Sequence, residues 1–138
     1  MDEAMRQFRR AIQIDPRYAK AHNNLGVALL DAGQTQPAVN EFMIALAADP
    51  RNVEALVNLA VVAQRENRPA EARDLLRRAV TIDPRNPGLQ YNFAAVADRS
   101  GDREQAIEHY RAFLRFVDVA HTSLVPLVRN RLAALGAG

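Results

Sequence analysis

Apolar residues recur every three or four positions along most of this chain of 138 residues, and polar residues fill the positions between them. This period is typical of an amphipathic α-helix with one buried face. Glycine, asparagine and Asp-Pro interrupt the pattern at regular intervals. The pattern predicts three helix pairs, at residues 19–32 with 36–48, 53–66 with 69–81, and 87–99 with 103–116, after a single helix at residues 2–14.

An internal repeat underlies these pairs. The dipeptide Asp-Pro occurs at Asp15-Pro16, Asp49-Pro50 and Asp83-Pro84, a step of 34 residues each time. The same step relates Asn24, Asn58 and Asn92; Leu25, Leu59 and Phe93; Gly26, Ala60 and Ala94; Ala4, Ala38, Ala72 and Ala106; and Phe8, Phe42, Leu76 and Tyr110. One pair of helices cannot bury its own apolar face, so such units form a core by stacking.

This pattern resembles the tetratricopeptide repeat (TPR) family. Residues 19–52 carry Leu25-Gly26, Ala38, Phe42, Ala45 and Pro50 at the family's spacing, and residues 53–86 carry Leu59-Ala60, Ala72, Leu76, Ala79 and Pro84. The resemblance implies an all-α fold, a right-handed α-solenoid of helix-turn-helix repeats within one domain of residues 1–138. We expect a half repeat at 1–18, repeats at 19–52 and 53–86, a degenerate repeat at 87–120 and a capping helix at 121–136.

Local signals predict where the helices begin and end. Gly33, Asn67 and Gly101 follow the first helix of each pair, where the backbone needs a positive φ. Asn52 and Asn86 are the expected N-caps of the next first helices.

Two more helix starts can be predicted near the C-terminus. Asp102 followed by Gln105 indicates a capping box. Ser123 is the expected N-cap of the final helix, with Pro126 in its first turn and Gly136 at its end.

Composition narrows the classes of protein. The chain is 49% hydrophobic and 25% charged, which is average for a soluble globular domain. It has no cysteine, which excludes disulfides, thiolate metal sites and a cysteine nucleophile, and we expect a cytoplasmic protein. No apolar run reaches the roughly 18 residues of a membrane helix. Lys20 is the only lysine, which indicates a GC-rich, bacterial coding sequence.

Residues with catalytic chemistry are sparse. His22, His109 and His121 have no mutual metal-ligand spacing and no nucleophile as a partner, and no phosphate-binding or zinc motif is present. We therefore expect no enzyme, no metal and no cofactor. His22 stands where the repeat usually has tryptophan, so a packing role is expected.

Arginines recur on the second helices, at Arg9-Arg10, Arg77-Arg78 and Arg111 with Arg115. They would suit a phosphate-binding stripe, or they form a solvated face next to acidic residues such as Asp74 and Glu108. The net charge of +2 is too small to indicate a nucleic-acid partner, so we expect none.

In the architecture implied by the resemblance, the first helices line a concave groove. The candidate peptide-binding residues there are Lys20, Asn23, Asn24, Val27, Val57, Asn58, Val61, Arg65, Tyr91, Asn92 and Arg99. An amide both donates and accepts, so the ladder of Asn24, Asn58 and Asn92 suits the backbone of a peptide, unless Asn is simply common at this position. The cations of the chaperone-binding carboxylate clamp are missing.

The sequence thus predicts a protein–protein interaction or scaffold module for an extended or helical peptide. Two alternatives remain: a regulatory or substrate-recruiting domain of a larger glycosyltransferase or methyltransferase, and a self-assembling structural unit. Residues 2–14 lack a first helix, so we expect Met5, Phe8 and Ile12 to form an open apolar flank. A second copy or a neighbouring molecule would cover it, and the chain would be a fragment of a longer repeat protein.

Overall fold

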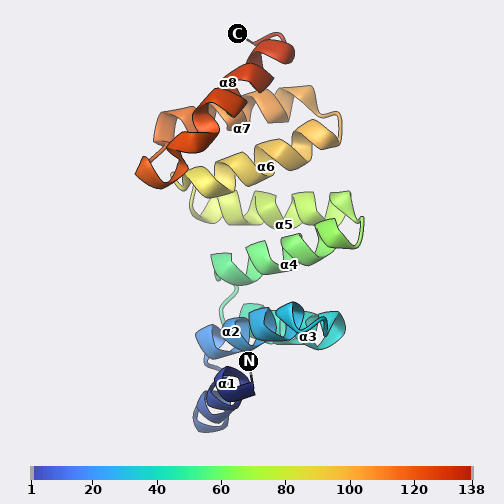
Figure 1. Ribbon diagram of the computed structural model, residues 1–138, viewed down its shortest axis with the longest axis vertical. Helices are drawn as coiled ribbons and strands as arrows, with labels where there is room; N and C mark the ends of the chain where they lie inside the picture. Colours follow the sequence, from blue (N-terminus) through green and yellow to red (C-terminus); the bar gives the residue numbers. More distant parts are fainter. Residues whose placement is uncertain (1, 138) are drawn as a thin grey trace. The chain divides into compact units, whose positions relative to one another are not determined.

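The computed structural model describes residues 2–137, which form eight α-helices, one 3-10 helix and no strand (Figure 1). The elements are α1 (Asp2–Ile14), α2 (Ala19–Asp31), α3 (Thr35–Ala48), α4 (Val53–Arg65), α5 (Pro69–Ile82), α6 (Pro87–Arg99), α7 (Arg103–Phe116), η1 (Val119–Leu124) and α8 (Val125–Ala134). The chain divides into two compact units, Met1–Arg68 with α1 to α4 and Pro69–Gly138 with α5 to α8. None of the described helices is long and apolar enough to cross a bilayer.

The helices predicted between residues 2 and 116 are all present, and none of their observed ends differs from its predicted position by more than one residue, whereas the capping helix predicted at 121–136 is observed at Val125–Ala134. Gly33, Asn67 and Gly101 have φ values of 79°, 58° and 78°, as expected where the chain turns sharply after a helix. The side chains of Asn52 and Asn86 accept hydrogen bonds from backbone N–H groups three residues later. The all-α helical-repeat fold is therefore confirmed.

The start of the last helix differs from the prediction. Ser123 is not an N-cap, because it lies inside η1 and α8 begins only at Val125. The backbone N–H of Val125 donates to the carbonyl of Thr122, so the 3-10 turn satisfies the donor that a serine side chain would have capped. Gly136 ends this segment with φ 81°, as predicted.

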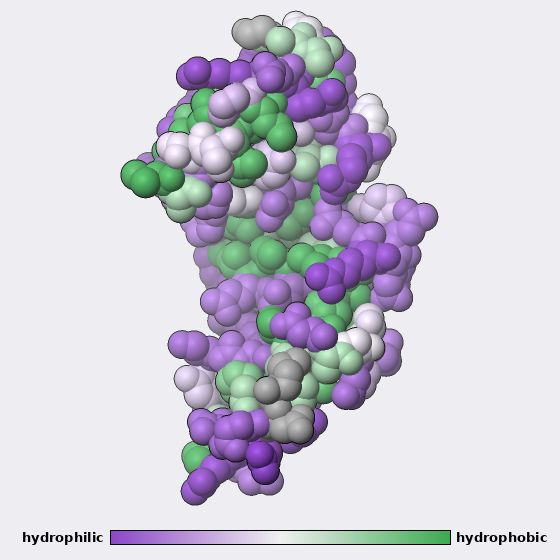
Figure 2. All heavy atoms as spheres, in the orientation of Figure 1, coloured by the Kyte–Doolittle hydropathy of each residue, from purple (hydrophilic) through white to green (hydrophobic). Residues whose placement is uncertain are grey.

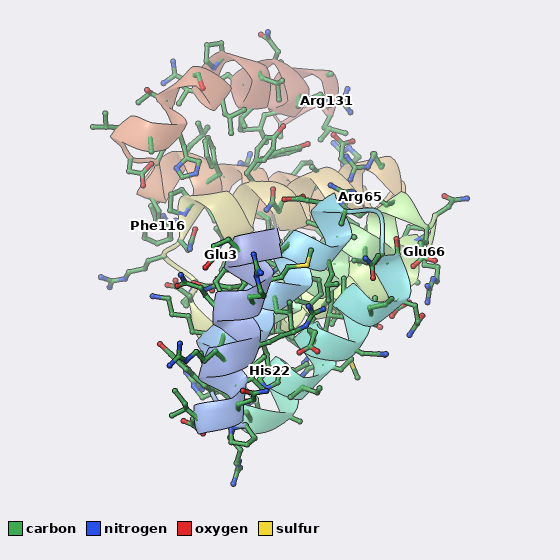
Figure 3. All side chains as sticks on the ribbon, turned by 60° about the horizontal axis from the view of Figure 1, so that its bottom comes forward. Glu3, His22, Arg65, Glu66, Phe116 and Arg131 are labelled. Carbon is green, nitrogen blue, oxygen red and sulfur yellow. The ribbon has the colours of Figure 1, made fainter. Side chains whose placement is uncertain are left out.

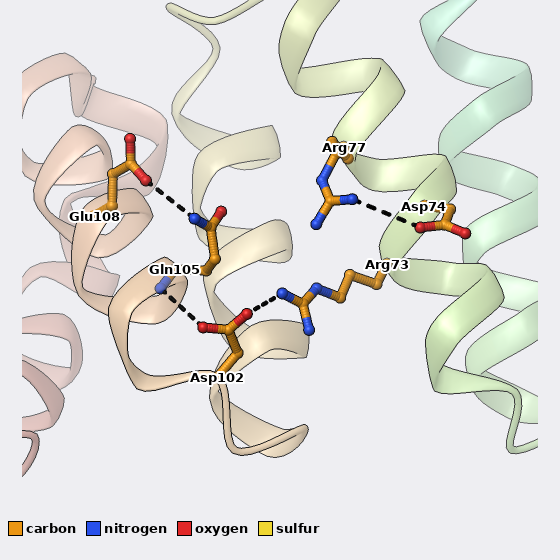
Figure 4. Close-up of polar contacts among 6 residues, drawn as sticks. All are labelled: Arg73, Asp74, Arg77, Asp102, Gln105 and Glu108. Carbon is orange, nitrogen blue, oxygen red and sulfur yellow. Dashed lines mark hydrogen bonds and ion pairs between the residues drawn. The ribbon is translucent and has the colours of Figure 1, made fainter.

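The capping box at α7 is half formed (Figure 4). The Asp102 carboxylate accepts from the Gln105 backbone N–H at 3.2 Å. The Gln105 side chain, however, donates to Glu108 at 3.4 Å instead of returning to the cap. One orphan donor of the helix end is thus satisfied by a side chain, where the box motif would satisfy two.

Small residues let the two helices of a pair approach closely in the first unit. Ala38, Phe42 and Ala45 of α3 are completely buried. A Cβ atom added at Gly26 of α2 would overlap the ring of Phe42. Glycine at this position is therefore a packing requirement, as the repeat pattern predicted.

A polar relay joins the two helices of the first pair. The ring of His22 is 4% exposed, and its Nε2 donates to the carbonyl of Pro16 at 2.7 Å. Its Nδ1 shares a hydrogen bond of 2.5 Å with the Glu41 carboxylate of α3. Figure 3 shows His22 among these helices of the first unit. The expected packing role of His22 is confirmed.

The same relay recurs in the second unit with other residues. Gln90 occupies the repeat position of His22 two repeats later, 68 residues along the chain. Its Nε2 donates to the carbonyl of Pro84 at 2.7 Å. The Nδ1–H of His109 donates to the Gln90 Oε1 at 2.6 Å. Burial lowers the pKa of His109, so this ring is a neutral donor to the glutamine.

α1 packs against α2, and this contact corrects one prediction. Met5 is only 7% exposed, so its expected place on an open flank is wrong. Phe8 and Ile12 are half-buried, and Ile14 is 80% exposed. The uncovered surface of α1 is therefore smaller than predicted and lies nearer the helix end.

Candidate binding surface

The first unit presents seven of the eight groove residues that were predicted on α2 and α4. Lys20, Val27 and Arg65 are exposed, and Val57 and Val61 are half-buried. Asn24 and Asn58 are also half-buried, and within residues 2–137 neither side-chain amide has a hydrogen-bond partner. Two free amides, one on each helix, are thus available to a ligand.

Asn23 differs from its neighbour Asn24. Its side chain is 1% exposed, and its Nδ2 donates to the Oδ1 of Asn52 at 3.0 Å. Asn52 in turn caps α4 by accepting from the Ala55 N–H at 2.9 Å. Asn23 therefore ties α2 to the start of α4 and has no surface to offer a peptide.

The second unit presents Tyr91, Asn92 and Arg99 on α6. Asn92 and Arg99 are exposed and, within the described part of the chain, their side chains have no hydrogen-bond or ion-pair partner. The half-buried Tyr91 ring packs against Tyr110 and Phe113 of α7, with ring centroids 6.3 and 5.8 Å apart. This aromatic base holds the tyrosine in place beside the free amide.

Asp98, which lies on the same helix, is bound by residues of its own chain. Arg131 of α8 donates two hydrogen bonds to its carboxylate, at 2.9 and 2.8 Å, and the Tyr110 hydroxyl donates a third at 3.0 Å. The Arg131 hydrogen bonds hold the pKa of Asp98 below its usual value, while burial raises the pKa of Tyr110. Figure 3 marks Arg131 on α8.

Sequence reasoning missed this latch between α6 and α8. The two partners, Asp98 and Arg131, stand 33 residues apart in the sequence. No local motif announces such a pair. The sequence offered only one hint of this pair: Asp98 is an acidic residue on the first helix of the third repeat, and Arg131 follows it 33 residues later.

No metal or catalytic constellation accompanies the surface within residues 2–137. They contain no group of three His, Asp or Glu side chains that could hold a metal ion. On the second helices, Asp102 accepts from Arg73, and Asp74 lies 3.8 Å from Arg77, as Figure 4 shows. Arg77 also lies 5.7 Å from the centre of the Phe93 ring. These arginines have partners inside the protein.

Paired helices in a 34-residue register, with unpartnered amides on the first helices, define a helical-repeat protein, a class whose members act mainly as interaction modules. Models of protein families identify a particular family within this class. Two models of the tetratricopeptide repeat match residues 28–87 and 63–114, and a third, a TPR repeat model, matches residues 1–33. The chain belongs to the tetratricopeptide repeat family.

Solved structures share the helical-repeat fold of this chain. Two crystal structures of MamA match with TM-scores of 0.72 and 0.70, each at 23% identity, over 84% and 83% of this chain. YrrB, "a TPR protein with an unusual peptide-binding site", matches with a TM-score of 0.70 at 21% identity over 84% of this chain. The chain spans 68% and 63% of the two MamA chains and 60% of YrrB. No curated relative matches it.

Proposed function

We propose that this protein is an interaction module that binds extended peptide segments through the first helices of its repeats, α2 and α4 in the first unit and α6 in the second. The observation that carries the proposal is the state of three asparagines. Asn24, Asn58 and Asn92 keep the 34-residue step, the first two are half-buried and the third is exposed, and none has a side-chain partner within residues 2–137. Free amides can pair with both the N–H and the C=O of a peptide backbone.

Neighbouring residues would select the side chains of the peptide. Val27, Val57, Val61 and Tyr91 offer apolar contacts beside the amides. Lys20, Arg65 and Arg99 are exposed cations without a partner among the described residues, which favours acidic positions in the ligand. The similarity in fold to YrrB, whose peptide-binding site is reported, supports the same class of ligand.

The relation of this surface to catalysis is also part of the proposal. The module itself catalyses no reaction. As the recruiting domain of a larger enzyme, it would use the same peptide-binding surface. A cytoplasmic setting suits a chain without cysteine.

The test starts from a displayed library of random peptides selected against the purified chain, with affinities measured by fluorescence polarisation. Asn58→Ala together with Asn92→Ala should weaken the selected peptides by roughly 1–3 kcal/mol, because each change removes hydrogen bonds to the ligand backbone. The melting temperature should stay at its wild-type value, since neither amide has a partner within the described chain.

Asn40→Ala is the matched control, because Asn40 is an exposed asparagine of the second helix α3. It should leave the affinity unchanged. Wild-type affinity in the double variant, or a loss equal to that of the Asn40 variant, would show that the first helices do not form the binding surface.

A further inference from the structure

α1 has an uncovered flank at positions that are sealed in the other second helices. Ala4 is exposed, and Phe8 and Ala11 are half-buried. The same repeat positions elsewhere are at most 3% exposed, at Ala38, Phe42, Ala45, Ala72, Leu76, Ala79, Ala106, Tyr110 and Phe113. The difference arises because no first helix of the described chain covers α1.

A hollow of about 600 Å³ lies on α1 beside this flank and shares Ala11 with it. It is lined by Glu3, Arg6, Gln7, Arg10, Ala11 and Ile14. Glu3 accepts from Arg6 and Gln7, whereas Arg10 has no partner within residues 2–137. Ile14 is 80% exposed at the end of the hollow. Figure 2 shows the surface over α1, at the bottom of the view, as mostly hydrophilic with apolar patches between.

A second hollow, of about 490 Å³, lies along α7. It is lined by Glu104, Ile107, Glu108, Arg111, Ala112 and Arg115. The half-buried Ile107 and Ala112 supply its apolar part, and the charged residues are exposed. Glu108 accepts only a long bond of 3.4 Å from Gln105, as Figure 4 shows, and Arg111 donates to the carbonyl of Ala137.

The two hollows have complementary charges when their helices run antiparallel. Aligning Glu3 with Arg115 also sets Arg10 opposite Glu108. The same alignment places the apolar Ala11 opposite Ile107. A parallel alignment that matches Glu3 with Glu104 instead sets Arg10 opposite Arg111, so like charges would meet at both places. A second parallel alignment sets Arg6 opposite Glu104 and again sets Arg10 opposite Glu108, so the Arg10–Glu108 pair can form in either orientation.

We propose that the α1 hollow of one copy of this protein docks onto the α7 hollow of a second copy, with Arg10 of one copy opposite Glu108 of the other. The contact joins two different surfaces, so a bound pair still presents one free α7 hollow and one free α1 hollow, and further copies can add. The inference does not rest on the proposed peptide binding, because no residue of either hollow belongs to the candidate binding surface.

Light scattering over a range of protein concentrations tests this contact. The wild-type mass should rise from 15.3 kDa towards twice that value and beyond as concentration increases, and added salt should reverse the rise because the charges are exposed. Arg10→Glu alone and Glu108→Arg alone should each stay at 15.3 kDa. An equimolar mixture of the two variants should associate again, because each α1 then meets an α7 of opposite charge.

Arg9→Glu is the matched control, since Arg9 is an exposed arginine of α1 that does not line the hollow. It should associate as the wild type does. A wild type of monomeric mass at every concentration would overturn the proposal. So would a Glu108→Arg variant that associates normally while Arg10→Glu does not, since α1 would then meet another surface, such as α1 of the second copy.

Discussion

The residue that best illustrates how this sequence specifies its helix pairs is His22. Its ring connects the carbonyl of Pro16 to the Glu41 carboxylate of the opposite helix. Two repeats later, Gln90 and His109 occupy the equivalent positions, with the same separation of 19 residues. The repeat between them has Leu56 and Leu75 there. These two positions of the repeat therefore hold hydrogen-bonded polar residues in two repeats and leucines in the one between them.

We predict strong coupling between His22 and Glu41. His22→Leu alone should cost about 1–3 kcal/mol of unfolding free energy, because the largely buried Glu41 carboxylate loses its hydrogen-bond partner. His22→Leu with Glu41→Leu should recover much of that loss, since the middle repeat already uses leucine at both positions. Urea unfolding of the wild type and three variants measures the coupling. Costs that simply add would contradict it.

Adjacent asparagines show what the sequence could predict at this scale. The periodicity placed both Asn23 and Asn24 on the inner face, and only Asn24 is free there. Asn23 lies one position earlier on α2, so its side chain points in another direction, towards Asn52, which caps α4 and is 29 residues away in the sequence. The repeat step identified the ladder, but it carries no information about which distant cap a neighbouring amide will meet.

At the scale of the helix pair, Gly26 controls how closely α2 approaches α3. Gly26→Ala should cost about 1–3 kcal/mol, because the new methyl group overlaps the Phe42 ring in a core without free space. Combined with Phe42→Leu, the same change should cost less than the sum of the two single variants. Thermal unfolding of the set checks this. A Gly26→Ala variant as stable as the wild type would show that the ring can move aside.

A helix end could be predicted from the sequence where a single residue determines it. It could not be predicted where the backbone conformation of several residues determines it. Gly33 and Asn67 sit at positions of positive φ that few residues tolerate, so their helix ends could be read from the sequence. The start of α8 depends on a 3-10 turn over Val119–Leu124, whose backbone bonds replace a side-chain cap. Ser123 had the right chemistry for a cap, but the path of the preceding backbone made it unnecessary.

For the molecule as a whole, His109 predicts how stability depends on pH. Burial lowers its pKa, so below about pH 6.5 the unfolded chain binds a proton that the folded chain resists. Stability should therefore fall between pH 7 and pH 5. Asp98, whose pKa Arg131 lowers, loses its contribution only in stronger acid, below its ordinary value of 3.8.

The variant His109→Gln isolates this effect, because its amide can still donate to Gln90 but does not titrate. Urea unfolding at pH 7 and pH 5 should show a larger loss of stability in the wild type than in the variant. Equal losses in both proteins would show that His109 does not couple folding to protons.

The polar relays also bear on misfolding. Repeats with similar backbones allow a nascent chain to join a first helix to the second helix of the wrong repeat. If α6 took the place of α2 beside α3, the Nε2 of Gln90 would still donate to the carbonyl of Pro84. The Oε1 of Gln90 would then face the Glu41 carboxylate, and two acceptors cannot form a hydrogen bond. If α4 took the place of α2 beside α3, Leu56 would stand where His22 does and leave the Glu41 carboxylate without a partner. Each wrong pairing is thus penalised, and the same rule would limit which repeats recombination can exchange without repacking.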